Sequence, residues 1–125
     1  MALYESGEDY LEAILMIRNE KGSVRSIDIA NRLGYSKPSV SRAMSILKNY
    51  EFIQMNEGGL ITLTESGLKI AEKIYERHNV IAAYFMQVLG VGEENAFEDA
   101  CKVEHDLSEE TFSAMKAKLK EFNEK

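Results

Sequence analysis

The sequence predicts a mostly α-helical protein in which an N-terminal winged helix-turn-helix is followed by a second group of helices. Apolar residues recur at intervals of three and four through most of the 125 residues, which is the spacing of one helical face. Two short runs rich in β-branched residues flank Gly58-Gly59, and this pattern predicts a hairpin. Helix, helix, turn, helix and hairpin, in that order, are the elements of a winged helix.

The first two helices are expected before residue 34. The first covers about 5–19 and ends at Gly22. Its apolar side chains at helical spacing are Tyr10, Leu11, Ile14, Leu15 and Ile17. The second covers 26–33, with Ser26 as its N-cap and Gly34 as the turn residue that follows. Its expected apolar positions are Ile27, Ile29, Ala30 and Leu33.

The third helix and the hairpin complete the predicted winged helix. Ser36 is expected to cap the helix, and Pro38 lies in its first turn, where a missing N–H does no harm. The predicted buried stripe of this helix is Val40, Ala43, Met44 and Leu47. The two strands are expected at 52–55 and 60–64, joined by a turn over 56–59.

Three further helices are predicted in the second half. Thr64 is expected to cap a long helix that continues to Leu89 and ends before Gly90. Its packing seam is predicted to be Leu68, Ala71, Tyr75, His78, Ala82, Phe85 and Leu89. A fifth helix is expected over about 93–105, and Ser108 is the expected N-cap of the last helix. The apolar edge of the fifth helix is Ala96, Ala100, Val103 and Leu107.

The charge of the chain is unevenly distributed. Its formal net charge is −6 at pH 7, but residues 22–50 hold five Lys or Arg against one Asp, a net +4. Residues 65–125 carry a net charge of −5. A basic segment in an acidic protein indicates a local contact with nucleic acid. We therefore predict a DNA-binding domain over 1–64 and a second, helical domain over 65–125.

The N-terminal end of the third helix is the expected DNA-reading element, because the second helix of a helix-turn-helix enters the major groove. Arg42 is suited to guanine, whereas Lys37 and Arg25 are suited to phosphates of double-stranded DNA. The full set of candidate DNA-binding residues is Arg25, Ser36, Lys37, Pro38, Ser39, Ser41 and Arg42. The alternative is that these Lys and Arg side chains form the solvated face of an ordinary helical bundle.

Six side chains in three stretches are candidate metal ligands. They are Asp9, Glu12, His78, Cys101, Glu104 and His105. The first two are three residues apart and share one helix face. The last three stand at positions i, i+3 and i+4, so their side chains can converge on one ion. Three carboxylates and one thiolate carry a formal charge of −4, which matches one or two divalent ions.

Each candidate ligand also has an interpretation without a metal. His78 can be a core histidine, the two N-terminal carboxylates can favour a helix dipole, and Cys101 can be a small apolar group. Glu104 and His105 can be surface residues. Burying all of these groups together without a cation is costly, which favours the metal. Oxygen ligands favour Mn²⁺, whereas a thiolate favours Fe²⁺, Co²⁺ or Zn²⁺.

With these motifs in place, the chain resembles the diphtheria-toxin-repressor family of metal-dependent transcriptional regulators, especially the short branch that regulates manganese transport. The resemblance covers nearly the whole chain and depends on the order and spacing of several strings. These are Glu8-Asp9-Tyr10-Leu11-Glu12, the segment 26–47, Leu63-Thr64-Glu65-Ser66-Gly67, Arg77-His78, and Cys101-Lys102-Val103-Glu104-His105 followed by Leu107-Ser108.

The resemblance implies a homodimer that binds a palindromic operator through two winged helices, with residues 65–125 forming the dimerisation domain. It also implies that the six candidate ligands bind one or two Mn²⁺ or Fe²⁺ ions per subunit, where the first helix meets the long and fifth helices. Asp9 matches the manganese branch and Cys101 matches the iron branch, so the resemblance leaves both Mn²⁺ and Fe²⁺ as the expected ion. Ion binding is expected to promote DNA binding and repression, and activation is the alternative. Longer, iron-responsive members of the family also have a C-terminal SH3-like domain, and this chain is not expected to contain one.

The sequence also restricts the class of protein. The start of the chain lacks a signal-peptide pattern and no apolar run reaches the roughly 20 residues of a membrane span, which predicts a cytoplasmic protein without membrane contact. A metal-dependent hydrolase is not expected, because no nucleophile or oxyanion motif accompanies the ligands. The alternative function is a winged-helix regulator that responds to an organic ligand or to oxidation of Cys101.

Overall fold

The computed structural model describes residues 5–124. Residues 1–4 of the predicted DNA-binding domain, which are the start of the segment expected not to be a signal peptide, lie outside this range, as does residue 125 of the second domain. The chain forms two compact units, Met1–Glu72 and Lys73–Lys125, and the division falls within one long helix. Each unit is described separately below.

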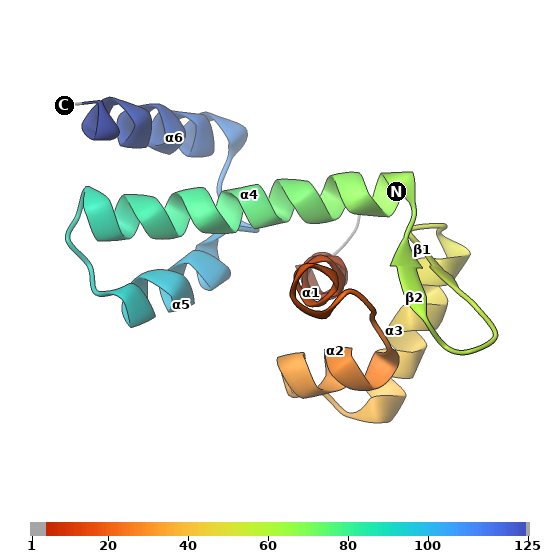
Figure 1. Cartoon of the computed structure of the whole chain (residues 1–125). Coiled ribbons are helices and arrows are strands. Elements are labelled where there is room, and N and C mark those ends of the chain that lie inside the picture. The colour runs from red at the N-terminus through yellow and green to blue at the C-terminus, as the bar shows by residue number, and fades with distance from the viewer. Residues whose placement is uncertain (1–4, 125) are drawn as a thin grey trace. The chain divides into compact units, whose positions relative to one another are not determined.

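The first unit is a winged helix-turn-helix, as predicted. Its elements are α1 (Glu5–Lys21), α2 (Ser26–Leu33), α3 (Lys37–Asn49), β1 (Ile53–Met55), β2 (Ile61–Leu63) and the first turns of α4 (Glu65–Gln87) (Figure 1). The strands pair antiparallel, with Gln54 opposite Thr62 at the centre of the hairpin. Helices α1, α2 and α3 pack on one another, and α1 also packs on β2.

Local signals start and end the helices of this unit. Gly34 ends α2 in the left-handed region (φ 71°), where its N–H donates to the Ala30 carbonyl over 2.9 Å. Ser36 caps α3 as predicted, because its Oγ accepts the Ser39 N–H over 3.3 Å. The prediction for α2 is wrong by one residue, since Arg25 is the N-cap and Ser26 the first helical residue. The cause is Asp28, whose carboxylate accepts the Arg25 N–H over 2.9 Å.

The core of the first unit is built from the predicted helix faces, with two corrections. Ala43, predicted in the buried stripe of α3, is only partly buried. Ile27 was expected among the apolar positions of α2, but it is 41% exposed. It lies two residues before Ile29, which turns its side chain about 200° around the helix, away from the core. The buried apolar side chains of the unit are Tyr10, Leu11, Ala13, Ile14, Leu15, Ile17, Val24, Ile29, Ala30, Val40, Met44, Leu47, Ile53, Ile61 and Ala71.

The start of α4 is joined to the corner between α3 and β1. Thr64 caps α4 as predicted, since its Oγ1 accepts the Gly67 N–H over 3.2 Å. The same hydroxyl donates to the Glu51 carbonyl over 2.6 Å. Gly67 lies so close to the Phe52 backbone that an added Cβ would stand 2.0 Å from the Phe52 oxygen. Only glycine fits at this contact.

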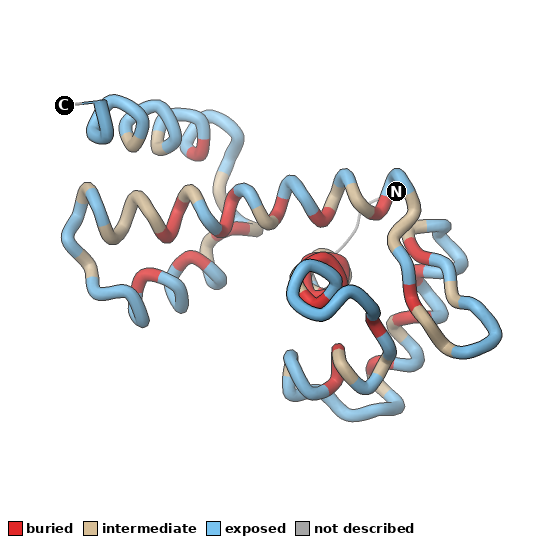
Figure 2. The backbone as a smooth tube through the Cα atoms, viewed as in Figure 1, coloured by how far each residue is buried: buried red, intermediate tan, exposed pale blue. Residues whose placement is uncertain are grey.

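The second unit is a small helical domain in which α5 (Glu93–Val103) and α6 (Glu109–Asn123) pack on the rest of α4. Its core consists of Ile81, Ala82, Ala100 and Phe112, and Figure 2 shows buried positions on all three helices. Ser108 caps α6 as predicted, because its Oγ accepts the Thr111 N–H over 3.1 Å. No helix within residues 5–124 is both long enough and apolar enough to cross a membrane.

Two helix ends in this unit differ from the prediction. Helix α4 ends at Gln87, and Leu89, expected in its seam, is 58% exposed. The chain turns there, with the Val91 N–H bonded to the Phe85 carbonyl over 2.9 Å, so Leu89 lies in the turn rather than on the helix. Helix α5 ends at Val103 rather than 105, because the Asp106 and Leu107 N–H groups both turn back to the Val103 carbonyl.

Candidate metal centre and nucleic-acid interface

Four of the predicted ligands come together within the second unit. His78 is on α4, Cys101 is on the last turn of α5, Glu104 is the C-cap of α5, and His105 follows in the turn. His78 Nδ1 lies 3.0 Å from Glu104 Oε2 and 3.6 Å from Cys101 Sγ. On the other side of the carboxylate, His105 Nε2 lies 3.3 Å from Glu104 Oε1. We call these four residues the ligand cluster.

The ligand cluster is polar and mostly withdrawn from water. The Glu104 side chain is 1% exposed, and the His105 side chain is 3% exposed. His78 is also buried, whereas Cys101 is exposed. A buried carboxylate requires compensating positive charge, which protons on the imidazoles or a bound cation can supply. The exposed thiol gives such a cation a route from solvent.

The spacing of the donor atoms fits a metal ion. Bonds of about 2.0–2.3 Å to nitrogen, oxygen and sulfur place neighbouring donors of one coordination shell roughly 3–3.8 Å apart. Three pairs of donor atoms in the ligand cluster have separations in this range, 3.0, 3.3 and 3.6 Å, and the two imidazoles lie on different oxygens of Glu104. The donor set combines imidazole, carboxylate and thiol, which is suited to divalent transition metals.

A neighbour that sequence reasoning missed orients His78. The Phe97 ring stacks on the His78 ring with centroids 5.6 Å apart and an angle of 10° between planes. Phe97 is 38% exposed. It is not part of the predicted apolar edge of α5, so the spacing of apolar residues predicts that it lies on the surface. Its one signal is its position four residues before Cys101, which places both on one face of α5.

The remaining two predicted ligands belong to the first unit. Asp9 and Glu12 lie on α1, three residues apart and therefore on one face, as predicted. Glu12 is 8% exposed, and Asp9 is partly buried. A carboxylate at 8% exposure on a helix rich in buried apolar residues is unusual unless its charge is compensated.

The candidate DNA-binding residues lie at the N-terminal end of α3, apart from Arg25. Lys37, Ser41 and Arg42 are exposed. Pro38 and Ser36 are also exposed, whereas Ser39 is partly buried.

Ser36, the N-cap of α3, and Ser39, in the first turn of the helix, are hydrogen-bonded to each other. Ser36 Oγ donates to Ser39 Oγ over 2.9 Å and accepts the Ser39 N–H, as described above. Their hydroxyls therefore hold the start of the helix. Lys37, Ser41 and Arg42 are exposed and stay candidates for contacts with DNA.

Arg25 has a structural contact that the sequence did not indicate. Its Nη1 donates to the carbonyl of Gly58 in the turn of the hairpin. Its backbone N–H is also held by Asp28. Arg25 therefore joins the start of α2 to the wing, and a phosphate contact by this residue would also fix the wing.

Comparison with known proteins identifies two matching family models that together cover most of the chain. Residues 2–58 match the model described as the iron dependent repressor N-terminal DNA binding domain. Residues 64–125 match the iron dependent repressor metal binding and dimerisation domain.

Similar proteins include transcriptional regulators from bacteria and archaea. The transcriptional regulator MntR of Salmonella typhimurium is 40% identical over 110 residues, covering 88% of this chain and 69% of MntR. An uncharacterised HTH-type transcriptional regulator of Methanocaldococcus jannaschii is 33% identical over 122 residues, covering 97% of this chain and 98% of the relative.

Solved structures agree with the fold. A manganese-dependent transcriptional repressor in complex with manganese superposes with a TM-score of 0.84 at 25% identity, over 90% of this chain and 52% of that one. IdeR of T. acidophilum superposes with a TM-score of 0.79 at 26% identity, over 92% of this chain and 53% of IdeR. The chain thus spans about half the length of these two solved proteins.

Proposed function

Because the chain belongs to the iron dependent repressor family, the family of diphtheria-toxin repressors, we propose that it is a metal-responsive transcriptional regulator. In this proposal, it binds operator DNA as a homodimer when a divalent metal occupies its site, and it represses transcription. The observation that carries the proposal is the buried Glu104 carboxylate, held between two imidazoles, with a thiol beside the imidazole of His78. This cluster can accept a cation in the domain that follows a winged helix.

Asp9 and Glu12 are proposed to complete the coordination of the ion. The ligand cluster offers one carboxylate and one thiolate, a formal charge of −2 that one divalent ion neutralises. Adding the α1 pair brings the charge to −4, enough for a second ion or for one ion with waters. Support comes from the spacing of the pair on α1 and from the family resemblance.

Manganese is the proposed ion, with iron as the second choice. The solved manganese-dependent repressor and the MntR relatives favour Mn²⁺. Cys101 is the one sulfur donor among ligands that otherwise offer oxygen and nitrogen. A thiolate increases the affinity of a site for softer ions such as Fe²⁺. Because this sulfur donor lies inside the ligand cluster, the relative affinities for the two metals depend on Cys101.

A metal bound by ligands from both domains explains regulation. With the α1 carboxylates as ligands, the ion would tie residues 1–64, the proposed DNA-binding domain, to the proposed dimerisation domain, 65–125. Two recognition helices must reach half-sites about 34 Å apart, so a fixed domain geometry favours binding. A coupling of about 1–3 kcal/mol, or 5–150-fold in affinity, is sufficient for such a switch.

Other features of the proposal follow from the family. Its members that are named here are regulators rather than enzymes, and we propose no catalytic activity. The cytoplasm is the proposed location, because this is where bacterial and archaeal operators are found. The DNA contacts are assigned to Arg25 and to the start of α3, with Lys37, Ser41 and Arg42 as the side chains that reach the groove.

The proposal is tested by selecting DNA from a random duplex pool with the full chain and Mn²⁺, and then measuring affinity for the selected duplex. We expect Mn²⁺ to tighten binding 5–150-fold relative to chelator. Glu104→Gln is expected to abolish this gain, whereas Glu98→Gln, an exposed substitution on the same helix, retains it. If the wild type binds the duplex as tightly in chelator as it does with Mn²⁺, the function is not metal-dependent. A response to peroxide that persists in chelator would instead support the Cys101 alternative.

A further inference from the structure

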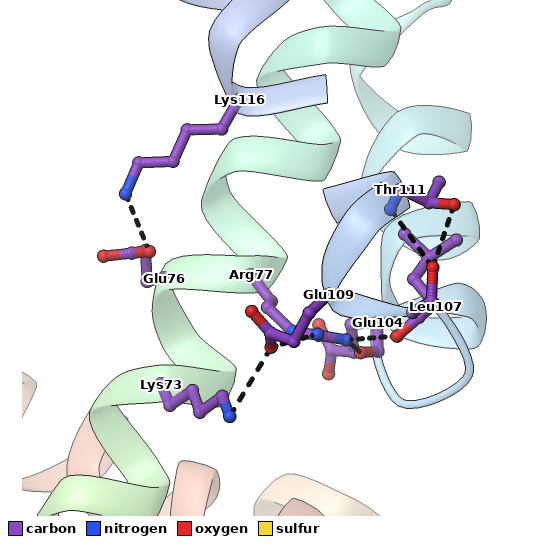
Figure 3. Close-up of polar contacts among 9 residues, drawn as sticks. Lys73, Glu76, Arg77, Glu104, Leu107, Glu109, Thr111 and Lys116 are labelled. Atoms are coloured by element: carbon purple, nitrogen blue, oxygen red, sulfur yellow. Dashed lines mark hydrogen bonds and ion pairs between the residues drawn. The ribbon is translucent and has the colours of Figure 1, made fainter. Parts of the chain in front are cut away.

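Arg77 and His78 are consecutive residues of α4 that hold the same residue, Glu104, by two different groups. His78 lies against the Glu104 carboxylate, as described above. Arg77 Nη1 donates to the Glu104 backbone carbonyl over 3.0 Å and to the Leu107 carbonyl over 2.8 Å. Figure 3 shows the guanidinium reaching into the turn between α5 and α6.

The guanidinium is enclosed by partners from two elements and the turn between them. Its Nη2 donates to Glu109 Oε1 at the start of α6 over 2.6 Å, and the Phe112 ring lies 5.0 Å beneath the guanidinium carbon. The Arg77 side chain is 8% exposed. The Glu104 carbonyl is at the C-terminal end of α5, where a cation also interacts favourably with the helix dipole.

We propose that Arg77 is a positioning residue of the metal site, which acts through the backbone of Glu104. This inference rests on the proposed function, in which Glu104 is a ligand. Glu104 is not inside a helix but at its C-cap, followed by a turn, so hydrogen bonds within α5 do not fix its carbonyl. Arg77 supplies the missing bond and thereby sets where the carboxylate stands relative to His78 and His105.

The geometry explains why this position requires arginine. A guanidinium presents several N–H groups in a rigid plane, and here that plane bonds two carbonyls and one carboxylate together. A lysine ammonium keeps the charge and can still pair with Glu109, but it cannot reproduce the planar fork. Arg77→Lys therefore keeps the positive charge of the side chain but weakens its hydrogen bond to the Glu104 carbonyl.

The alternative role for Arg77 is only to attach α6 to α4. The two roles use different bonds, because the contact with α6 runs through Glu109 and the contact with the ligand runs through the Glu104 carbonyl. Glu109→Gln weakens the first and leaves the second intact. It is therefore the matched control for Arg77→Lys.

The experiment uses the full chain in five forms: wild type, Arg77→Lys, Arg77→Gln, Glu109→Gln and Glu104→Gln. Thermal unfolding without metal establishes that each one folds. Titration with Mn²⁺ then gives the affinity, and the absorption spectrum of bound Co²⁺ reports the geometry of the ligands. We expect Arg77→Lys to bind Mn²⁺ about 10–100-fold more weakly, with a changed Co²⁺ spectrum. Glu109→Gln is expected to match the wild type in both measurements.

The outcomes distinguish this inference from the proposed function. If Glu104→Gln binds Mn²⁺ as tightly as the wild type, Glu104 is not a ligand and the proposed function itself is at fault. If Glu104→Gln loses binding while folded Arg77→Lys keeps wild-type affinity and spectrum, only the positioning role is overturned. Arg77→Gln, which lacks a buried charge, is made in parallel. If neither Arg77 variant folds, Arg77 holds the fold together and the positioning role is also overturned.

Discussion

His78 Nδ1 stands 3.0 Å from Glu104 Oε2, which joins the middle of α4 to the C-cap of α5 through two side chains that can share a cation. The second imidazole, from His105, lies on the opposite oxygen of the same carboxylate at 3.3 Å. Glu104 is therefore at the centre of the ligand cluster. The Cys101 thiol lies beside the first imidazole, 3.6 Å from His78 Nδ1.

Replacement of the thiol is expected to change the metal preference. Cys101→Asp substitutes an oxygen ligand for sulfur, so we expect affinity for Mn²⁺ to be kept and affinity for softer Co²⁺ or Zn²⁺ to fall. Competition titrations of each pair of metals against one chelator measure the change. Cys101→Ser is the control for loss of the thiolate without a new charge. An unchanged order of metal affinities in Cys101→Asp would show that the thiol is not a ligand.

Gly67 is predicted to be essential for the stability of the first unit. A Cβ at this position would lie 2.0 Å from the Phe52 oxygen, so Gly67→Ala must displace the start of α4 or the strand corner. We expect a loss of about 1–3 kcal/mol in the free energy of unfolding. Denaturant titration followed by circular dichroism measures it. Gly58→Ala is the control, since its added Cβ meets only Asn56 at 3.5 Å.

The DNA-reading surface is predicted to show two kinds of effect. Arg42→Ala is expected to cost about 1–3 kcal/mol of affinity and to relax specificity at one position of the site. Lys37→Ala is expected to weaken binding to all sequences alike and to lower the salt slope by about 1. Lys118→Ala on α6 is the control. Fluorescence anisotropy at several salt concentrations separates these effects, and equal changes for all three variants would contradict the assignment.

The start of α2 is predicted to lose stability in acid. The hydrogen bond from Lys21, and then that from the Arg25 N–H, hold the pKa of Asp28 below its ordinary value of 3.8. A carboxylate with a lowered folded pKa stabilises the fold fully above its unfolded pKa, and the stabilisation disappears as pH falls through the folded pKa. Asp28→Asn should be less stable than wild type near neutral pH, and the difference should shrink at pH values below 3.8. Thermal unfolding across this range measures it, and a difference independent of pH would contradict it.

The sequence predicted the elements of the fold well where a local signal was present. Ser36, Thr64 and Ser108 cap their helices as expected, because a hydroxyl before a helix acts on the next few residues alone. Leu89 was misplaced because apolar periodicity continues past Gln87, where α4 ends, into the turn before Gly90. A periodic pattern does not show where the packing partner of a helix ends.

The ligand cluster was also predictable in part. His78, Cys101, Glu104 and His105 were found from residue chemistry and spacing, and the structure brings them together. Arg77 and Phe97 could not be found this way. The carbonyls that Arg77 contacts have no sequence signal, since every residue has one. The stacking of Phe97 on His78 depends on how α5 packs against α4.

The most direct test of the account measures Mn²⁺ affinity of the full chain twice, with and without a saturating amount of its selected DNA duplex. If metal and DNA binding are coupled, each ligand must tighten the other by the same factor. We therefore predict that DNA lowers the Mn²⁺ dissociation constant 5–150-fold, matching the gain in DNA affinity that Mn²⁺ produces. An Mn²⁺ affinity that is the same with and without DNA would contradict the central claim.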